Sequence, residues 1–423
     1  MTADAQLAAS MLDMGRSARD AARTLAAVNP QVRDDALQYV AEAIKEDGSD
    51  IVSTNKEDVS AAKSKGLSSA MIDRLTLDAD RLSSVVASVE AISRQADPVG
   101  RSLHQWTQPN GLRFDRVSVP IGVIGMIYES RPNVTADAAA LCIRSGNAVI
   151  LRGGSEAVQT NRALYAAIRK GLARSDVPAS AVQLVATQER AAVGALLRGL
   201  DGTVDLIIPR GGKGLIERVQ TDARVPVLAH LDGLNHTYIH RSADIDMALN
   251  IVENAKMRRT GVCGATETVL VDRSVAVAII PSLVNRLSAL DCEIRGDEAS
   301  RALHPAVVPA SEDDFATEHL APILNLAVVD DLQQALDHIS TYGSGHTDAI
   351  VAEEQTAAEV FLRRVDSAIV LHNASTQFAD GGEFGFGAEI GIATGRLHAR
   401  GPVGADQLTT FKYQVTGSGT LRA

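Results

Sequence analysis

The sequence predicts an α/β fold built on parallel sheets. From about residue 119, short apolar segments alternate with helical segments of about 10–15 residues, which is the pattern of βαβ units. A second α/β pattern follows after about residue 230. The chain has 423 residues, of which 45% are hydrophobic and 22% charged, so it has the composition of a folded protein. At about 150 residues per domain, it should form two to three domains.

The first hundred residues have helical periodicity. Asn29 and Pro30 are typical of the cap and first turn of a helix, and the pattern continues until Gly48. The apolar residues in between recur at i, i+3, i+4 and i+7, at Leu37, Val40, Ala41 and Ile44. The same spacing returns at Leu82, Val85, Val86 and Val89. This part of the chain is therefore expected to be structural.

Four short apolar segments predict the strands of the first sheet: Val123–Tyr128, Ala148–Leu151, Val182–Val185 and Val204–Ile208. An Ala-rich helix is expected from Thr135 to Gly146, and another from about Ser155. Ligands of such sheets bind beyond the carboxyl ends of the strands. Three of these ends continue into segments that combine glycine or polar groups with a cation: Glu129–Arg131, Arg152–Ser155 and Pro209–Gly214.

The second half of the chain begins with a predicted helix over Met247–Lys256. The turn Gly261–Gly264 and several strand-like segments follow it. The tail from about residue 395 alternates Leu, Thr, Phe and Tyr without a helical signal, so it should form an arm or hairpin.

The composition argues against several classes of function. A net charge of −11 makes nucleic acid or an anionic membrane an unfavourable partner. The longest apolar stretch, Val275–Val284, has ten residues, whereas a membrane-spanning helix needs about 20. Asp4 stands where a signal peptide would carry positive charge. Three cysteines without a CxxC spacing indicate a reduced, cytoplasmic protein, and the histidines have no metal-ligand spacing, so no metal site is predicted.

Cys263 is the candidate nucleophile. It lies between glycines in RRTGVCGATETV, shortly after Lys256, Arg258 and Arg259. Nearby cations and an uncrowded backbone lower a thiol pKa and let a substrate carbon approach the sulfur. An isolated cysteine is often only a buried core residue, but the flanking glycines favour a functional role. Cys142 on an apolar helix face and Cys292 in a strand-like segment are expected to be core residues.

Two glycine-rich turns are candidates for a dinucleotide site. Arg152, in VILRGGSEA, places a cation and backbone N–H groups at a strand-to-helix junction, which suits a phosphate group. PRGGKG is a second such turn, although it matches neither GxGxxG nor a Walker sequence. Either turn alone could use its glycines only for close packing. Together they predict a nucleotide-type site.

Five long segments are informative together: PIGVIGMIYESRPNVTADAAALCIRSGNAVILRGGSEA, IPRGGKGLI, VPVLAHLDGLNHTYIH, NAKMRRTGVCGATETVL and EFGFGAEIGIATGRLHARGPVGADQLTTFKY. They resemble the γ-glutamyl phosphate reductase (glutamate-5-semialdehyde dehydrogenase) family of the aldehyde dehydrogenase superfamily. They occur in order over nearly the whole chain. The resemblance implies an aldehyde dehydrogenase-like fold, with a Rossmann-type cofactor domain, an α/β catalytic domain and a small β-hairpin oligomerisation element.

The resemblance also implies how the chain is divided. The NADP-binding domain is expected in 1–103 and 119–229, completed by about 366–395. The catalytic domain with the nucleophilic cysteine is expected in 230–365, and the oligomerisation arm in 104–118 and 396–423.

The reaction that the resemblance implies is NADPH-dependent reduction of L-glutamyl 5-phosphate to L-glutamate 5-semialdehyde in L-proline biosynthesis. GVCGATET matches the cysteine motif of the superfamily, so the thiolate of Cys263 would displace phosphate and form a thioester. The resemblance implies a homo-oligomer, and a functional association with glutamate 5-kinase is expected because glutamyl phosphate is labile. The alternatives are a CoA-acylating or non-phosphorylating aldehyde dehydrogenase of the same fold, or a non-catalytic binding protein.

The sequence departs from the wider superfamily at two catalytic positions. His230, in AHLDG, stands where hydrolytic members carry a Glu general base, which fits a reductase that has no need to activate water. Ser130 stands at the place of the Asn that stabilises the oxyanion. Asn133 or Asn254 could supply that donor instead, beside the backbone N–H of Cys263.

The resemblance further implies which residues bind cofactor and substrate. Arg152 replaces a Lys of the superfamily and suits an adenosine 2′-phosphate, which predicts NADP(H). Glu318, in TEHLAP, would hold the nicotinamide ribose, unless it is an ordinary solvated acid. The other expected cofactor contacts are Gly153, Ser155, Gly211 and Gly212. The cationic candidates for the substrate are Arg131, Arg259, His398 and Arg400.

Overall fold

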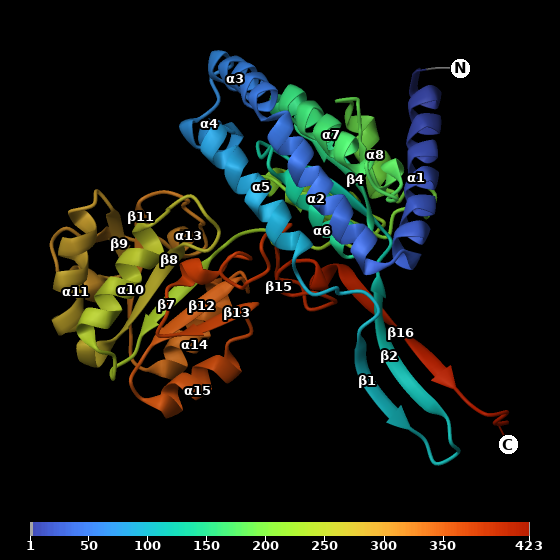
Figure 1. The fold of residues 1–423 in the computed structure, drawn as a ribbon. Helices are drawn as coiled ribbons and strands as arrows, with labels where there is room; N and C mark the ends of the chain where they lie inside the picture. Colours follow the sequence, from blue (N-terminus) through green and yellow to red (C-terminus); the bar gives the residue numbers. More distant parts are fainter. Residues whose placement is uncertain (1–2, 423) are drawn as a thin grey trace. The chain divides into compact units, whose positions relative to one another are not determined.

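The computed structural model describes residues 3–422, which divide into two compact units (Figure 1). Unit 1 contains the described residues up to Ala229, together with Gly385–Gly391 and the chain from Leu397 onward. Unit 2 contains His230–Phe384 and Ile392–Arg396. None of the described helices is long and apolar enough to cross a bilayer.

Unit 1 begins with helices, as the periodicity predicts. They are α1 (Ala3–Ala27), α2 (Pro30–Glu46), α3 (Gly48–Ser64), α4 (Ser69–Leu75) and α5 (Ala79–Ser93). The Asn29 side chain caps α2 by accepting the Gln31 N–H at 3.0 Å. α2 ends at Glu46, and Gly48 begins the next helix instead of closing the first.

The sheet of unit 1 has four parallel strands in the order β5-β4-β3-β6. They are β3 (Val123–Tyr128), β4 (Ala148–Gly153), β5 (Val182–Leu184) and β6 (Leu206–Arg210). The helices that alternate with them are α6 (Val134–Arg144), α7 (Val158–Leu172), α8 (Arg190–Leu197) and α9 (Lys213–Asp222). Every residue of β3 is buried, as expected for a central strand covered on both faces. This is the βαβ arrangement predicted for residues 119–229.

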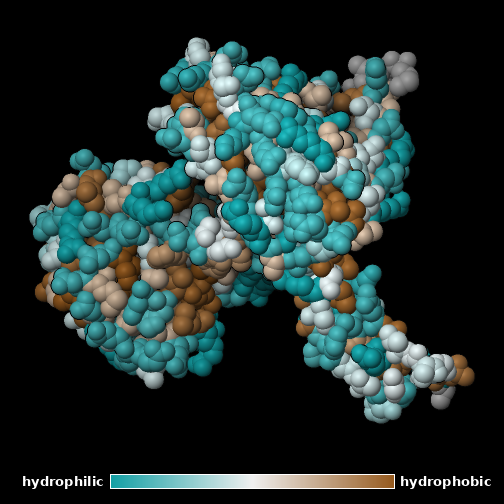
Figure 2. Space-filling view, in the orientation of Figure 1, coloured by the Kyte–Doolittle hydropathy of each residue, from teal (hydrophilic) through white to brown (hydrophobic). Residues whose placement is uncertain are grey.

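The tail pairs with an earlier segment of unit 1, as the family resemblance implies. β2 (Arg113–Pro120) is antiparallel to both β1 (Ser102–Thr107) and β16 (Thr409–Thr416). In the tail, the short strand β15 (Gly401–Pro402) precedes β16. The arm exposes several large apolar or aromatic side chains: Leu103, Phe411, Tyr413 and Val415. Figure 2 shows the surface of one face of the molecule, where hydrophilic and hydrophobic residues are interspersed.

Unit 2 contains a seven-stranded sheet in the order β10-β9-β11-β8-β7-β12-β13, in which all neighbours are parallel. The strands are β7 (Asn235–Ile239), β8 (Thr266–Asp272), β9 (Glu293–Gly296), β10 (Val308–Pro309), β11 (Ile323–Val329), β12 (Thr347–Val351) and β13 (Ile369–His372). The helices are α10 (Ile245–Met257), α11 (Arg273–Ser288), α12 (Glu298–Arg301), α13 (Glu312–Phe315), α14 (Leu332–Tyr342) and α15 (Gln355–Arg364). A last short strand, β14 (Ile392–Ala393), also belongs to this unit.

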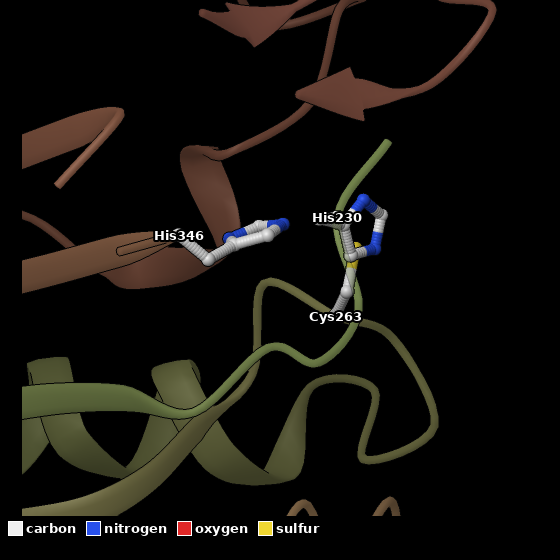
Figure 3. A group of neighbouring side chains, drawn as sticks. All are labelled: His230, Cys263 and His346. Atoms are coloured by element: carbon white, nitrogen blue, oxygen red, sulfur yellow. The ribbon is translucent and has the colours of Figure 1, made fainter. Parts of the chain in front are cut away.

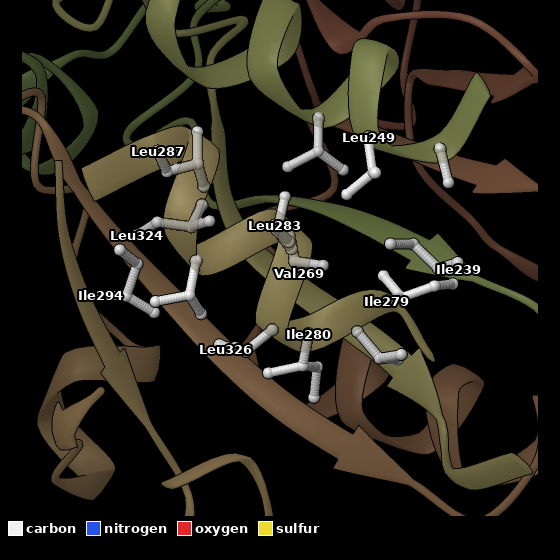
Figure 4. Close-up of a cluster of buried hydrophobic side chains, with 14 of the residues drawn as sticks. Ile239, Leu249, Val269, Ile279, Ile280, Leu283, Leu287, Ile294, Leu324 and Leu326 are labelled. Carbon is white, nitrogen blue, oxygen red and sulfur yellow. The ribbon is translucent and has the colours of Figure 1, made fainter. Parts of the chain in front are cut away.

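Alternate residues of β8 form the two cores of unit 2. Val269 and Val271 pack in a cluster with α10 and α11, which Figure 4 shows, whereas Leu270 packs in a cluster with α14 and α15. Successive side chains of a strand point to opposite faces, so the sheet is covered on both sides. Cys292 is buried in the first of these clusters, which confirms that it is a core residue. It lies just before β9 and not within a strand.

The expected completion of the cofactor domain by about 366–395 needs correction. β13 pairs with β12, which places residues 366–384 in the sheet of unit 2. Only Gly385–Gly391 returns to unit 1, where Gln95 Nε2 donates to the Phe386 carbonyl and Arg210 pairs with Glu389.

Replacing Gly171 should test the packing of α2 against α7. A Cβ at Gly171 would lie 2.5 Å from Val40 Cα and 2.6 Å from the Tyr39 carbonyl oxygen, so the two backbones would have to separate. We expect Gly171→Ala to lower the free energy of unfolding by about 1–3 kcal/mol, the usual cost of overpacking. Urea unfolding followed by circular dichroism measures this.

Gly194→Ala is the matched control, because a Cβ on this helical glycine meets only the end of Arg198 at 3.3 Å. It should leave stability unchanged or raise it by up to about 1 kcal/mol. Equal stabilities for the two variants would contradict the close packing of α2 and α7.

Candidate active site

Cys263 lies in unit 2, in the turn between α10 and β8. Gly233 and His346 lie at corresponding positions, because they precede β7 and β12. These three strands are neighbours in a parallel sheet, so their amino ends meet at one edge. The candidate site of unit 2 is therefore at the amino ends of its strands.

A buried amide holds the turn of Cys263 in place. Asn235 Nδ2 donates to the carbonyl oxygens of Cys263 at 2.6 Å and of Ala265 at 2.9 Å. The Asn235 Oδ1 accepts the Thr347 N–H at 3.1 Å. One fully buried side chain thus joins the nucleophile turn to the strand that follows His346.

Gly233 also fixes the turn, through close approach. A Cβ at this position would lie 2.2 Å from the Cys263 carbonyl oxygen and 2.9 Å from Cys263 Cα. Only glycine permits this contact without displacing the turn.

Two imidazole rings lie beside the thiol. Cys263 Sγ and one nitrogen from each of His230 and His346 all lie within 4.8 Å of one another, and Figure 3 shows the three side chains pointing together. The centroids of the His230 and His346 rings are 4.9 Å apart, and the angle between the ring planes is 75°. His230 donates from Nδ1 to the Ile392 carbonyl at 2.7 Å, and His346 Nδ1 lies 2.9 Å from Thr347 Oγ1. The Nε2 atom of each ring is then the one suited to face the thiol.

The thiol of Cys263 is set up to ionise. Burial opposes ionisation of the sulfur, but the charges of His346 and His230 and hydrogen bonding with His230 lower the pKa of Cys263 well below its usual range. Burial raises the pKa of Cys142, and it raises that of Cys292 to about 11, so these two thiols stay protonated near neutral pH. The structure thus distinguishes Cys263 from both core cysteines.

Glu318 lies beside the same turn. Its Oε1 accepts the Gly233 N–H at 3.0 Å, and burial and the nearby Cys263 raise its pKa. The following segment is tied to a buried ion pair, because Glu267 binds Lys256 Nζ at 2.7 Å and accepts the Leu320 N–H at 3.3 Å. Burial raises the pKa of Glu267 to about 7 against the opposing charge of Lys256. Glu318 is thus half-buried rather than a freely solvated acid.

In unit 1, the predicted loops meet at the carboxyl ends of the strands. Tyr128, which ends β3, pairs with Gly153 of β4 on one side and with Arg210 of β6 on the other. Glu129 donates its N–H to the Arg210 carbonyl and accepts the Gly212 N–H at 3.3 Å. All three glycine-rich or polar segments therefore share one edge of the sheet.

The expected cofactor contacts lie at this edge. Gly153 and Gly211 are positions of close approach, since added Cβ atoms would lie 2.1 Å from Asn161 Nδ2 and 2.6 Å from Glu129 Oε2. Gly212 caps α9, and Ser155 is exposed at the start of a short 3₁₀ helix. The glycines at 153 and 211 are thus required by close packing within the chain, and contact of these four residues with a cofactor stays a prediction.

Arg152 is half-buried at the same edge. It donates to the Gln188 carbonyl at 3.1 Å, and its buried Nε has no hydrogen-bond partner among the described residues. Burial lowers the pKa of Arg152, while the carboxylates of Glu156 and Glu129 stabilise its charge. Glu156 also accepts hydrogen bonds from the Ser130 N–H and hydroxyl.

The candidate oxyanion donors differ in their surroundings. Asn133 Nδ2 donates to Asp137 at 2.8 Å in unit 1. Asn254 is exposed on α10, and within residues 3–422 no hydrogen bond joins its side chain to the turn of Cys263. Engagement of both side chains with oxyanions stays a prediction.

The cationic candidates for the substrate belong to different units. Arg259 is exposed in unit 2 just before the turn of Cys263, and its carbonyl accepts from Gln377. Arg131, His398 and Arg400 belong to unit 1. His398 is exposed and hydrogen-bonded to the Gln407 carbonyl.

Sequence reasoning missed the role of His346. The residue is far from Cys263 along the chain and follows the glycine and serine of YGSGH, with no local pattern to mark it. It also missed Asn235 and the Lys256–Glu267 pair, whose contacts depend on strand register.

Comparisons with known proteins identify the family. The aldehyde dehydrogenase family model matches residues 2–302. The chain is 58% identical to the gamma-glutamyl phosphate reductase of Caulobacter vibrioides over 97% of this chain and 100% of that protein. It is 54% identical to that of Parvibaculum lavamentivorans over the full length of both. The crystal structure of the Thermotoga maritima gamma-glutamyl phosphate reductase has a TM-score of 0.94 at 41% identity, covering 98% of this chain and 100% of that one.

The chain also resembles the structures of more distant enzymes. The glyceraldehyde-3-phosphate dehydrogenase GapN of Methanocaldococcus jannaschii, complexed with NADP, has a TM-score of 0.69 at 16% identity, covering 97% of this chain and 95% of that one. At this identity, the likeness indicates a common fold.

The pH dependence of alkylation should reveal the ionised thiol. We expect iodoacetamide to modify Cys263 with a midpoint well below the value of about 8.5 for an ordinary thiol. His346→Gln removes the strongest favourable electrostatic partner and should move the midpoint upward. Peptide mass spectrometry follows the modification.

His304→Gln is the control for this experiment, because His304 bonds to Asn285 on the surface of the same unit. It should behave as the wild type. An unchanged midpoint in His346→Gln would show that His346 does not ionise the thiol.

Gly233→Ala should disturb the same site through the backbone. Its Cβ would displace the Cys263 carbonyl, so we expect a loss of about 1–3 kcal/mol in unfolding free energy and slower alkylation at pH 7. Gly261→Ala is the control, because its Cβ would come no nearer than 4.0 Å to Leu320 O. Equal alkylation rates in the two variants would exclude the close approach as a constraint on Cys263.

Proposed function

Because this chain belongs to the aldehyde dehydrogenase family and matches gamma-glutamyl phosphate reductases over nearly its full length, we propose that it reduces L-glutamyl 5-phosphate to L-glutamate 5-semialdehyde, releasing phosphate, in L-proline biosynthesis. NADPH supplies the hydride that reduces the acyl carbon. The observation that carries the proposal is the ionised Cys263 beside His230 and His346.

Cys263 begins the reaction as a nucleophile. Its thiolate attacks the acyl carbon of the substrate, and the carbon–oxygen bond to phosphate breaks, leaving a thioester on Sγ. The lowered pKa supplies the thiolate without a separate proton-transfer step. Asn235 and Gly233 keep the sulfur in position by fixing the backbone of its turn.

The same side chains serve the second half of the reaction. Reduction of the thioester gives a hemithioacetal, whose collapse expels the Cys263 thiolate and releases the aldehyde. The neighbouring imidazoles stabilise that thiolate as it leaves, because they favour its charged form. The Cys263 backbone N–H is our candidate donor to the oxyanions of both tetrahedral species, with Asn133 or Asn254 as the second donor.

The presence of His230 where hydrolytic members carry a Glu base supports reduction over hydrolysis. The Nδ1–H of His230 donates to the Ile392 carbonyl, which leaves Nε2 as the nitrogen suited to face the thiol. In this role His230 supports the thiolate and does not replace the Glu base that activates water. Phosphate is already a good leaving group, and the thioester is consumed by reduction, so no water needs to be activated. A CoA-acylating or hydrolytic dehydrogenase would turn over without phosphate.

We infer that the cofactor binds at the carboxyl edge of the first sheet. Arg152 would contact the 2′-phosphate, Gly153, Ser155, Gly211 and Gly212 would lie against the pyrophosphate region, and Glu318 would bind the nicotinamide ribose. The half-buried position of the Arg152 guanidinium at this strand end supports a phosphate contact, although Glu129 and Glu156 stand near the same group. NADPH is therefore preferred over NADH. Arg131, Arg259, His398 and Arg400 are our candidates for the charged groups of the substrate.

We also infer that the chain forms a homo-oligomer through its arm. The edges of a three-stranded sheet can pair with another strand, and β16 exposes about half of Phe411, Tyr413 and Val415. A functional association with glutamate 5-kinase would shorten the lifetime of the free acyl phosphate.

The reverse reaction tests this function. We expect continued NADPH formation from glutamate semialdehyde and NADP⁺ only when inorganic phosphate is present, because phosphate must cleave the thioester. Cys263→Ala should abolish it, whereas Cys292→Ser, which changes a core thiol, should retain it. Nicotinamide absorbance follows the reaction. Sustained turnover without phosphate would reassign the enzyme to hydrolytic or CoA-dependent chemistry, and failure to bind NADP(H) would favour a non-catalytic protein.

Cofactor preference tests Arg152. Arg152→Gln should raise the KM for NADPH about tenfold or more and leave that for NADH nearly unchanged, because a charge-assisted phosphate contact contributes about 1.5–3 kcal/mol. Arg162→Gln is the control, since Arg162 also donates to a nearby backbone carbonyl, that of Ala186, but is outside the strand edge. Equal changes for both cofactors would exclude a 2′-phosphate contact.

A further inference from the structure

We propose that Cys263, His230 and His346 form a reversible binding site for Zn²⁺, which inhibits the enzyme by occupying its nucleophile. The proposal rests on the arrangement of these three side chains. It does not depend on the substrate being glutamyl phosphate.

The three side chains offer the donor set of a zinc site. One sulfur and two imidazole nitrogens all lie within 4.8 Å of one another, and no other group of three His, Cys, Asp or Glu residues in the described part of the chain does so. A thiolate and neutral imidazoles are the ligands that zinc prefers. The three residues come from separate segments that the sheet brings together, so the linear spacing predicted no metal site.

The unengaged nitrogen of His346 is an independent indication of a ligand. His346 is fully buried, and its Nε2 has no hydrogen-bond partner among the described residues. Figure 3 shows this ring pointing toward Cys263 and His230. A buried imidazole nitrogen without a partner costs free energy, which a metal bond would recover.

The second nitrogen of each ring is held as it is in metal sites. Ligating histidines usually engage their other ring nitrogen with a carbonyl, carboxylate or other oxygen, which fixes the orientation of the ring. Here His230 Nδ1 donates to the Ile392 carbonyl at 2.7 Å, and His346 Nδ1 lies 2.9 Å from Thr347 Oγ1. Both Nε2 atoms are thereby directed to the thiol.

Only a small movement is needed to bind the ion. Zn–S and Zn–N bonds of about 2.3 and 2.1 Å require ligand atoms about 3.3–3.7 Å apart in a tetrahedral site. Rotation of the side chains within their 4.8 Å group can supply this. Binding forms one Zn–S and two Zn–N bonds, releases any proton on the thiol, and leaves a fourth position for water. The sulfur lone pair needed for attack is then used by the metal.

Cobalt binding to the full chain tests the site independently of catalysis. We expect one Co²⁺ per chain, with the sulfur-to-cobalt charge-transfer band of a thiolate ligand and the visible bands of a four-coordinate ion. Cys263→Ser should abolish the charge-transfer band. His346→Gln should weaken Co²⁺ and Zn²⁺ binding by more than the about 10–100-fold that loss of a supporting hydrogen bond costs a metal site. Zn²⁺ should compete with Co²⁺ and inhibit activity, and a chelator should restore it.

Cys292→Ser and His304→Gln are the matched controls, because they remove a thiol and an imidazole elsewhere in unit 2. Both should bind Co²⁺ as the wild type does, and circular dichroism checks the fold of each variant. The absence of the thiolate band, or equal affinity in His346→Gln and wild type, would overturn the proposal. An enzyme that is inactive without metal, but shows the band once Co²⁺ is added, would instead refute the proposed function and leave the metal site standing.

Discussion

The parallel register of β7, β8 and β12 is the constraint on which the active site depends. It brings the residues before three neighbouring strands to one edge, so Gly233, Cys263 and His346 converge without being close in sequence. The Asn235 amide then links two of these segments. An error in register would move every one of these groups. The chemistry of the thiol is thus a consequence of how the sheet is assembled, and the same convergence creates the donor set for a metal ion.

Much of the fold could be predicted because its signals are local. The strand segments and the Asn29–Pro30 helix start follow from periodicity and turn residues, whereas the pairing of the tail with an earlier segment was implied by the family resemblance. Cys263 could be singled out because it lies between glycines, but the predicted electrostatic cause needs correction: His346 and His230 lower its pKa, whereas Lys256 is paired with Glu267. His346 could not be singled out, because its meeting with the thiol is a product of strand order. The assignment of about 366–395 to the cofactor domain is wrong for a similar reason, because the strand pairing of β13 places it in the sheet of unit 2.

The electrostatics of the two sheets differ. In unit 2, two imidazoles overcome the cost of burying a thiolate, whereas Glu318 and Glu267 have raised pKa values because burial dominates their environment. In unit 1, Arg152 faces Glu129 and Glu156. In a protein with net charge −11, cationic or hydrogen-bonding groups beside the thiol and at the edge of the first sheet are the local features that can attract an anionic ligand.

The most direct test of the central claim, that Cys263 carries the acyl group, is a single-turnover experiment without phosphate. Enzyme mixed with glutamate semialdehyde and NADP⁺ should release one NADPH per active Cys263 and then stop, and mass spectrometry should find the glutamyl group on the peptide that contains Cys263. A burst of this size with the acyl group on that cysteine is the result that the account predicts. Absence of a burst, or an acyl group on any other residue, would contradict it.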